Sequence, residues 1–157
     1  MIGEHQIKTI MLFYELEKSL YEFYEVLSRT YPEHDTLWKR LMEEEQMHAE
    51  SVQKLYRLIY DGKTLFDEGT IQHAGVQSII DYVHGITDSA RNKAYTEKQV
   101  LTITRDIERT LIEKKLFNYF RVAPEFTDLL RTLREGSEGH SAMAEKELAK
   151  ISDKKNP

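Results

Sequence analysis

The two interior prolines constrain the fold of this chain more than any other feature of its sequence. Apart from the final residue, Pro32 and Pro124 are the only prolines among 157 residues, so long segments are free to form helices. Within these segments apolar residues recur at spacings of three and four, the period of one helical face. The stripe of the first segment consists of Ile7, Ile10, Met11, Tyr14, Leu20, Tyr21, Tyr24 and Leu27. The pattern predicts an all-α protein.

The breaks between the stripes predict four long helices in a single domain, residues 1–157. A proline disfavours helical geometry in the preceding residue but fits the first turn of the next helix. The expected helices cover residues 4–29, 33–60, 97–121 and 124–151. Residues 62–95 contain four glycines and should form a long crossover with one short amphipathic helix. Two antiparallel hairpins joined by this crossover predict a four-helix bundle.

Two local motifs mark the ends of these helices. Gly62 follows the second helix, at the position where a glycine commonly terminates helical geometry. Thr96 and Gln99 have the spacing of a capping box, in which each side chain bonds the backbone of the other residue. They predict that a helix begins just after Thr96.

The composition excludes several classes of function. Lysine and arginine total 22 against 27 aspartates and glutamates, and the interleaved signs give a net charge of −5 with no basic stripe for nucleic acid and no polybasic membrane patch. No apolar run approaches the roughly 20 residues that cross a bilayer, and the N-terminus lacks a secretory signal, so we expect a soluble cytoplasmic protein. Cysteine is absent, so any metal must be bound by oxygen and imidazole nitrogen.

Three ionisable residues interrupt the apolar faces of the first two helices. Glu17 lies on the face of the first helix, and Glu45 and His48, three residues apart, lie on that of the second. A buried charge is costly unless another group pairs with it. Counted in residues along the chain, Glu17 is farther from Pro32 than Glu45 is, and nearer to it than His48 is. An antiparallel hairpin would therefore bring the three side chains to one height.

The second hairpin repeats this pattern about Pro124. Glu108 lies as many residues before this proline as His140 lies after it. Ser137 lies one helical turn before His140. Glu108 should lie beside His140, and the clusters of the two hairpins should face each other across the bundle. Three carboxylates and two imidazoles in a dry interior suit iron, manganese or zinc, and two half-sites indicate a pair of ions bridged by carboxylates.

Several similar residues are expected to have no such role. A single Glu-x-x-His is a weak signal, because most such pairs lie on solvated helix faces. Asp81 and His84 have the same spacing without a partner at matching height, so we expect both at the surface. Glu43 and Glu44 are also expected to be solvated. The remaining histidines, expected near helix ends or in loops, are His5, His34 and His73.

The buried residues also have an interpretation without a metal. Glu17 and Glu108 could form buried salt bridges, and His140 could be a hydrogen-bonded core histidine. The doubling of one pattern about two prolines favours the metal site. Nearby tyrosines could donate hydrogen bonds or electrons, although tyrosines at helical spacing are more often core residues. These tyrosines are Tyr14, Tyr21 and Tyr24.

The chain resembles the ferritin-like superfamily, and specifically its rubrerythrin-like branch, over nearly its whole length. Residues 17–24 (EKSLYEFY), 43–49 (EEEQMHA) and 133–140 (LREGSEGH) carry the resemblance. Bundles of this kind take a Glu from each of two helices and a Glu-x-x-His from each of the other two. The metal ligands that the resemblance implies in this chain are Glu17, Glu45, His48, Glu108 and His140.

The resemblance also implies a chemistry. It implies iron, two ions if the site is complete, with manganese or zinc as alternatives. The activity would be iron oxidation coupled to reduction of a small oxidant such as peroxide or oxygen, and the assembly would be a homodimer. Because the chain has no cysteine, it lacks the four-cysteine iron site of rubredoxin and therefore a complete rubrerythrin electron path.

Two positions depart from the ligand pattern of this family. Ser137 stands where the second Glu-x-x-His would have its glutamate, and the adjacent Glu138 lies on a different face. Lys115 lies seven residues after Glu108, where its ammonium could replace the charge of a second ion or could reach past the stripe to solvent. Both departures favour the alternative function, a bundle with a degraded or mononuclear site that acts as a non-enzymatic structural or partner-binding dimer.

Overall fold

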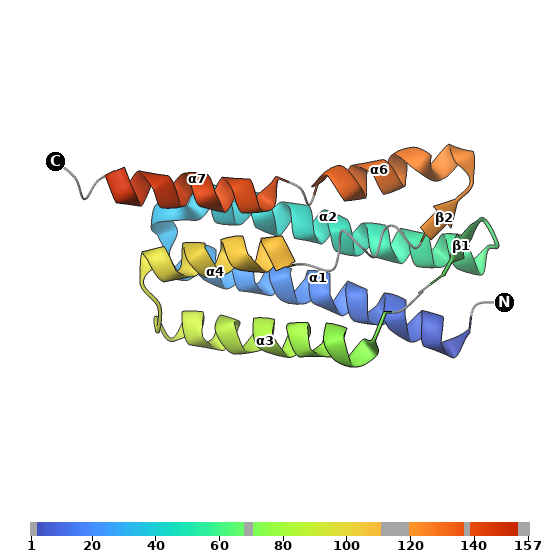
Figure 1. Cartoon of the computed structure of the whole chain (residues 1–157), viewed down its shortest axis with the longest axis horizontal. Coiled ribbons are helices and arrows are strands. Elements are labelled where there is room, and N and C mark those ends of the chain that lie inside the picture. Colours follow the sequence, from blue (N-terminus) through green and yellow to red (C-terminus); the bar gives the residue numbers. More distant parts are fainter. Residues whose placement is uncertain (1–2, 68–70, 111–119, 137–138, 154–157) are drawn as a thin grey trace.

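A computed structural model describes residues 3–67, 71–110, 120–136 and 139–153, most of which lie in helices that run alongside one another (Figure 1). The prediction of a mostly helical protein is therefore confirmed. The elements in chain order are α1 (Glu4–Thr30), a 3-10 helix (Pro32–His34), α2 (Asp35–Tyr60), β1 (Thr64–Phe66), α3 (His73–Arg91), α4 (Glu97–Thr110), β2 (Phe120–Val122), a second 3-10 helix (Pro124–Phe126), α6 (Thr127–Gly136) and α7 (His140–Asp153).

The hairpin of α1 and α2 agrees with the sequence pattern. Pro32 opens the 3-10 helix that turns the chain, so α2 begins at Asp35, two residues later than expected. Gly62 follows α2 with a φ of 69°, the left-handed conformation in which glycine terminates a helix. The two helices are antiparallel and pack along their lengths (Figure 1). This hairpin sets the relative height of side chains on α1 and α2.

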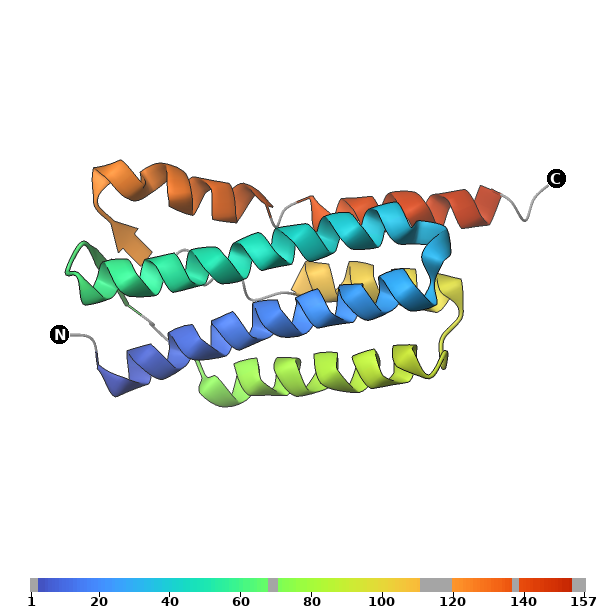
Figure 2. The same ribbon diagram turned by 180° about the vertical axis from the view of Figure 1, so that it is seen from behind.

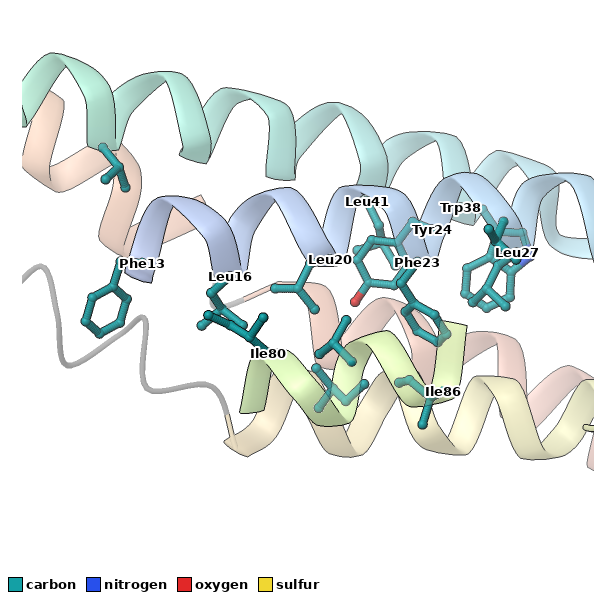
Figure 3. Close-up of a cluster of buried hydrophobic side chains, with 14 of the residues drawn as sticks. Phe13, Leu16, Leu20, Phe23, Tyr24, Leu27, Trp38, Leu41, Ile80 and Ile86 are labelled. Carbon is teal, nitrogen blue, oxygen red and sulfur yellow. The ribbon is translucent and has the colours of Figure 1, made fainter. Parts of the chain in front are cut away.

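The crossover differs from the prediction, because α3 is a helix of 19 residues and not a short one. Gly75 and Gly85 lie inside it at exposed positions, where an added Cβ would meet no atom within 4 Å. Glycine lowers helix propensity by about 1 kcal/mol there but does not end the helix. The buried face of α3 packs against α1, and Figure 3 shows Ile80 and Ile86 within the same hydrophobic cluster as Leu16 and Leu20.

The helix predicted over residues 97–121 begins as expected but does not extend to its expected end. The capping box is formed as predicted, with Gln99 N–H donating to Thr96 Oγ1 at 3.3 Å and Thr96 N–H donating to Gln99 Oε1 at 2.8 Å. However, residues 120–122 are not helical and instead form β2, which pairs antiparallel with β1. The Phe120 ring packs on Phe66 of β1 with centroids 4.5 Å apart, and this tertiary contact favours the extended conformation over the helix.

The helix predicted over residues 124–151 is also interrupted. It is divided into the second 3-10 helix, α6 and α7, with Gly136 as the last residue of α6 and Gly139 in the bend before α7. Two glycines so close together disfavour a continuous helix. Both views show α6 and α7 end to end along α2 (Figures 1 and 2). His140 is therefore the first residue of a new helix.

Helices α4 and α7 pack against each other, although β2 and α6 lie between them in the chain, and α7 also contacts α2. Helices α1, α2, α4 and α7 can therefore each direct side chains into a shared interior. None of the described helices combines the length and apolar character that a membrane span requires.

Candidate metal centre

Four helices bring together five buried ionisable side chains, each at most 1% exposed. They are Glu17 on α1, Glu45 and His48 on α2, Glu108 on α4 and His140 on α7. One group comprises Glu17, Glu45 and His48, and the other comprises Glu45, Glu108 and His140. In each group three ligand atoms lie within 4.8 Å of one another. All five residues that the sequence singled out therefore meet, and Glu45 belongs to both groups.

The Glu45 carboxylate stands between the two imidazoles. Its Oε2 atom lies 3.1 Å from His48 Nδ1, and its Oε1 atom lies 3.2 Å from His140 Nδ1. On one side, Glu17 Oε2 lies 3.6 Å from His48 Nδ1. On the other side, Glu108 Oε2 lies 3.1 Å from His140 Nδ1. Each group therefore combines two carboxylates with one imidazole, a set of ligands that could hold a metal ion.

Burial and mutual repulsion shift the pKa values of the three carboxyl groups. Burial raises the pKa of Glu17 well above its usual value, and the nearby Glu45 raises it further. Burial also raises the pKa of Glu108, although a hydrogen bond with His140 opposes the shift. Burial acts in the same direction on Glu45, but its contacts with His140 and His48 outweigh this effect and lower its pKa. Glu45 is therefore the carboxylate that most readily carries a negative charge.

His140 supplies the opposite charge. Burial alone would lower its pKa, but its contacts with the carboxylates of Glu108, Glu44 and Glu45 raise the pKa of His140 to about 12. Without an ion in the site, His140 is therefore a cation at neutral pH. Its charge offsets that of Glu45, and an arriving metal cation would have to displace a proton from this imidazole.

Several carboxylate oxygens of the site have no hydrogen bond. Among the described residues, no hydrogen bond is found for either oxygen of Glu17 or for Glu45 Oε1, although Glu45 Oε1 lies 3.2 Å from His140 Nδ1; all three atoms are buried. A buried polar group without a partner costs about 1–3 kcal/mol, and more if it is charged. Carboxylate oxygen with imidazole nitrogen is a donor set that suits iron, manganese or zinc. A metal ion would satisfy these oxygens, so the residues present fit one.

Tyr24 adds a hydrogen bond to the site. Its hydroxyl donates to Glu108 Oε1, which leaves Glu108 Oε2 directed at His140. The Tyr24 ring is fully buried and stacks on Trp38, with centroids 6.5 Å apart and planes 7° from parallel (Figure 3). Tyr24 thus combines the two roles considered for these tyrosines, because its hydroxyl donates a hydrogen bond to the site and its ring lies in the core. Tyr14 and Tyr21 are only half-buried.

Glu44 corrects one expectation from the sequence. It is not a solvated surface residue, because its Oε2 atom accepts a hydrogen bond from His140 Nε2 and its side chain is only 21% exposed. Glu43 is exposed, as predicted. Neighbouring residues on a helix point about 100° apart, so the periodicity that directs Glu45 into the core does not predict a buried position for Glu44. It reaches the site because α7 lies over that side of α2.

His34 is a second histidine whose surroundings the sequence did not predict. It lies near a helix end as expected, but it is 8% exposed and stands between two carboxylates. Its Nδ1 atom is 3.0 Å from Glu147 Oε2, and its Nε2 atom is 2.5 Å from Glu97 Oε1. Asp81 and His84 are both exposed, as predicted.

Ser137 and Lys115, where the sequence departs from the expected ligand pattern, lie outside the described residues, as does Glu138. Their effect on a second ion stays a prediction. Comparison of the chain with known protein families, with curated proteins and with solved structures found no significant match, so its function has to be inferred from the site itself.

Proposed function

We propose that this chain is a ferritin-like, rubrerythrin-type protein that binds two metal ions, with iron as the metal. The observation that carries the proposal is the position of Glu45, which is shared by two buried groups of ligands. The buried oxygens of Glu17, which have no hydrogen bond within the described part of the chain, support it, because a cation would compensate their burial. The contribution of ligands by four packed helices is also typical of dinuclear bundle proteins.

In this proposal each residue has a definite role. Glu17, Glu45 and His48 would hold one ion, and Glu45, Glu108 and His140 would hold the other. Bound iron would supply the electrons that reduce a small oxidant such as peroxide or oxygen.

The protein around the ligands orients them and excludes bulk water. Tyr24 holds Glu108 in place through Oε1, and its hydroxyl brings a phenolic proton to the edge of the site. Trp38 and Leu41, both fully buried, belong to the hydrophobic cluster that includes the Tyr24 ring (Figure 3). A dry interior of this kind strengthens the attraction between carboxylates and a cation.

One observation favours a second candidate function, a structural bundle with a mononuclear or degraded site. His140 already contacts three carboxylates, those of Glu44, Glu45 and Glu108, so its positive charge is balanced without an ion. In that case the α7 side of the site would be an ionic core cluster. Only the group of Glu17, Glu45 and His48 would then bind metal. The number of ions bound per chain distinguishes the two candidates.

The proposal predicts that His48→Ala loses metal and that His84→Ala does not. His48 is buried beside two carboxylates, whereas His84 is exposed on α3. We expect bound iron to fall from about two ions per chain to one or fewer in His48→Ala. Metal content is measured by atomic emission after anaerobic loading with Fe(II) and gel filtration. Equal metal content in the two variants, both folded by circular dichroism, would remove His48 from the site.

A further inference from the structure

Glu44 touches the site without belonging to either group of ligands. Its two oxygens have different partners: Oε1 accepts a hydrogen bond from Arg40 Nε at 3.0 Å, and Oε2 accepts one from His140 Nε2. Arg40 is largely exposed, Glu44 is mostly buried and His140 is fully buried. Glu44 therefore connects a surface cation on its own helix with an imidazole at the start of α7.

The two nitrogens of His140 have different surroundings. Nδ1 lies 3.2 Å from Glu45 Oε1 and 3.1 Å from Glu108 Oε2, whereas Nε2 contacts Glu44. Nδ1 is therefore the nitrogen on the side of the shared carboxylate. A neutral imidazole can offer the lone pair of Nδ1 only if its single proton is on Nε2.

We propose that Glu44 is a positioning residue for His140: its carboxylate accepts a hydrogen bond from Nε2–H and so directs Nδ1 toward Glu45 and Glu108. This inference rests on the proposed metal-binding function. Metal-binding histidines generally donate their second ring N–H to a carboxylate or carbonyl, which fixes both the tautomer and the ring orientation. Arg40 fixes the Glu44 carboxylate in turn, because it occupies the other oxygen.

The geometry distinguishes this role from that of a ligand. The contact of Glu44 is with Nε2, on the edge of the ring that does not face Glu45 and Glu108. Glu44 also belongs to neither group whose ligand atoms lie within 4.8 Å of one another. Its removal should therefore weaken the binding of an ion without removing the binding position.

The first test measures metal affinity in Glu44→Ala, Glu44→Gln and the matched control Glu43→Ala. Titration with Co(II), followed by its visible spectrum, should show about 10–100-fold weaker binding of one ion in Glu44→Ala, with unchanged stoichiometry at saturation. Glu44→Gln keeps an acceptor oxygen and should recover most of the affinity. The proposal is overturned if Glu44→Ala binds like Glu43→Ala, or if it loses one ion outright as a ligand variant would.

The second test uses the metal-free protein, so it does not depend on the proposed function. The Nε2 proton of His140, assigned by its loss in His140→Gln, should give a slowly exchanging low-field NMR signal because Glu44 accepts it in a buried site. This signal should be present in wild type and Glu43→Ala and absent in Glu44→Ala. Persistence of the signal in folded Glu44→Ala would overturn the positioning role. Failure of the wild type to bind Co(II) would instead contradict the proposed function, whatever this signal shows.

Discussion

Substitution of Glu45 by glutamine will remove metal binding from both groups of ligands at once. Glu45 is the one residue that the two groups share, and its two oxygens face the two imidazoles separately, at 3.1 and 3.2 Å. The amide is nearly the same size, so the packing is kept, but it carries no negative charge and cannot bridge two cations. The affinity for both ions should fall by more than the roughly 10–100-fold that loss of an outer hydrogen-bond partner costs.

Glu43→Gln is the matched control, because it makes the same change two residues away on the exposed face of α2. Isothermal titration of each metal-free protein with Mn(II), which does not oxidise readily in air, gives affinity and stoichiometry together. The control should bind like wild type. If Glu45→Gln is folded and still binds one ion with wild-type affinity, the two groups are independent and Glu45 does not bridge them.

The second large effect is expected at Glu17, whose substitution by glutamine should stabilise the metal-free protein at neutral pH. Burial raises the pKa of Glu17 well above its usual value, so the folded protein favours the protonated form. The contribution of Glu17 to the free energy of unfolding is fully present below the ordinary pKa of about 4.3. It is lost as the pH rises through the raised pKa, by up to about 1.4 kcal/mol per pH unit. Glutamine cannot ionise and avoids this loss.

The difference in unfolding free energy between Glu17→Gln and wild type should therefore increase from about pH 4.5 upward, reaching about 1–4 kcal/mol at pH 7.5. Urea denaturation at several pH values measures it. The comparison of variant with wild type separates Glu17 from Glu108 and His140, whose pKa values are also raised. Glu15→Gln, an exposed position on the same helix, should show no such increase.

Metal should act against this difference in stability. An ion that binds only the folded state stabilises it by about 2.7 kcal/mol at a free concentration of 100 times its Kd. Wild type should gain this stabilisation, and Glu17→Gln should gain less because a neutral amide replaces its anionic carboxylate. A variant that is less stable than wild type at pH 7.5 without metal would show that the buried Glu17 carboxylate is compensated within the protein itself.

The sequence predicted the first half of the site well because its geometry depends on two uninterrupted helices. Glu17 and His48 could be placed at one height by counting from Pro32, since α1 and α2 continue through both positions. The same count placed Glu108 beside His140, and the structure brings them together although α6 and α7 are separate helices. The position of His140 is therefore set by the contacts of α7 with α4 and α2, and not by a continuous helix that begins at Pro124.

Other features depend on contacts that no single stretch of sequence contains. Glu44 joins the site from a helix face that its own periodicity assigns to solvent, because α7 covers it. His34 is partnered by Glu97 and Glu147, which lie 63 and 113 residues further along the chain. The pairing of β1 with β2 involves segments of three residues, too short for a strand pattern to be recognised.

Anaerobic titration of the metal-free wild-type protein with Fe(II) tests the central proposal most directly. Bound and free iron are separated by equilibrium dialysis and counted per chain, and circular dichroism verifies that the protein is folded. We expect saturation of the wild type at about two ions per chain, and greatly weakened binding of both ions in Glu45→Gln. A folded wild-type protein that binds no iron, manganese or zinc at concentrations up to about 1 mM, the weak end of biological affinity, would contradict it.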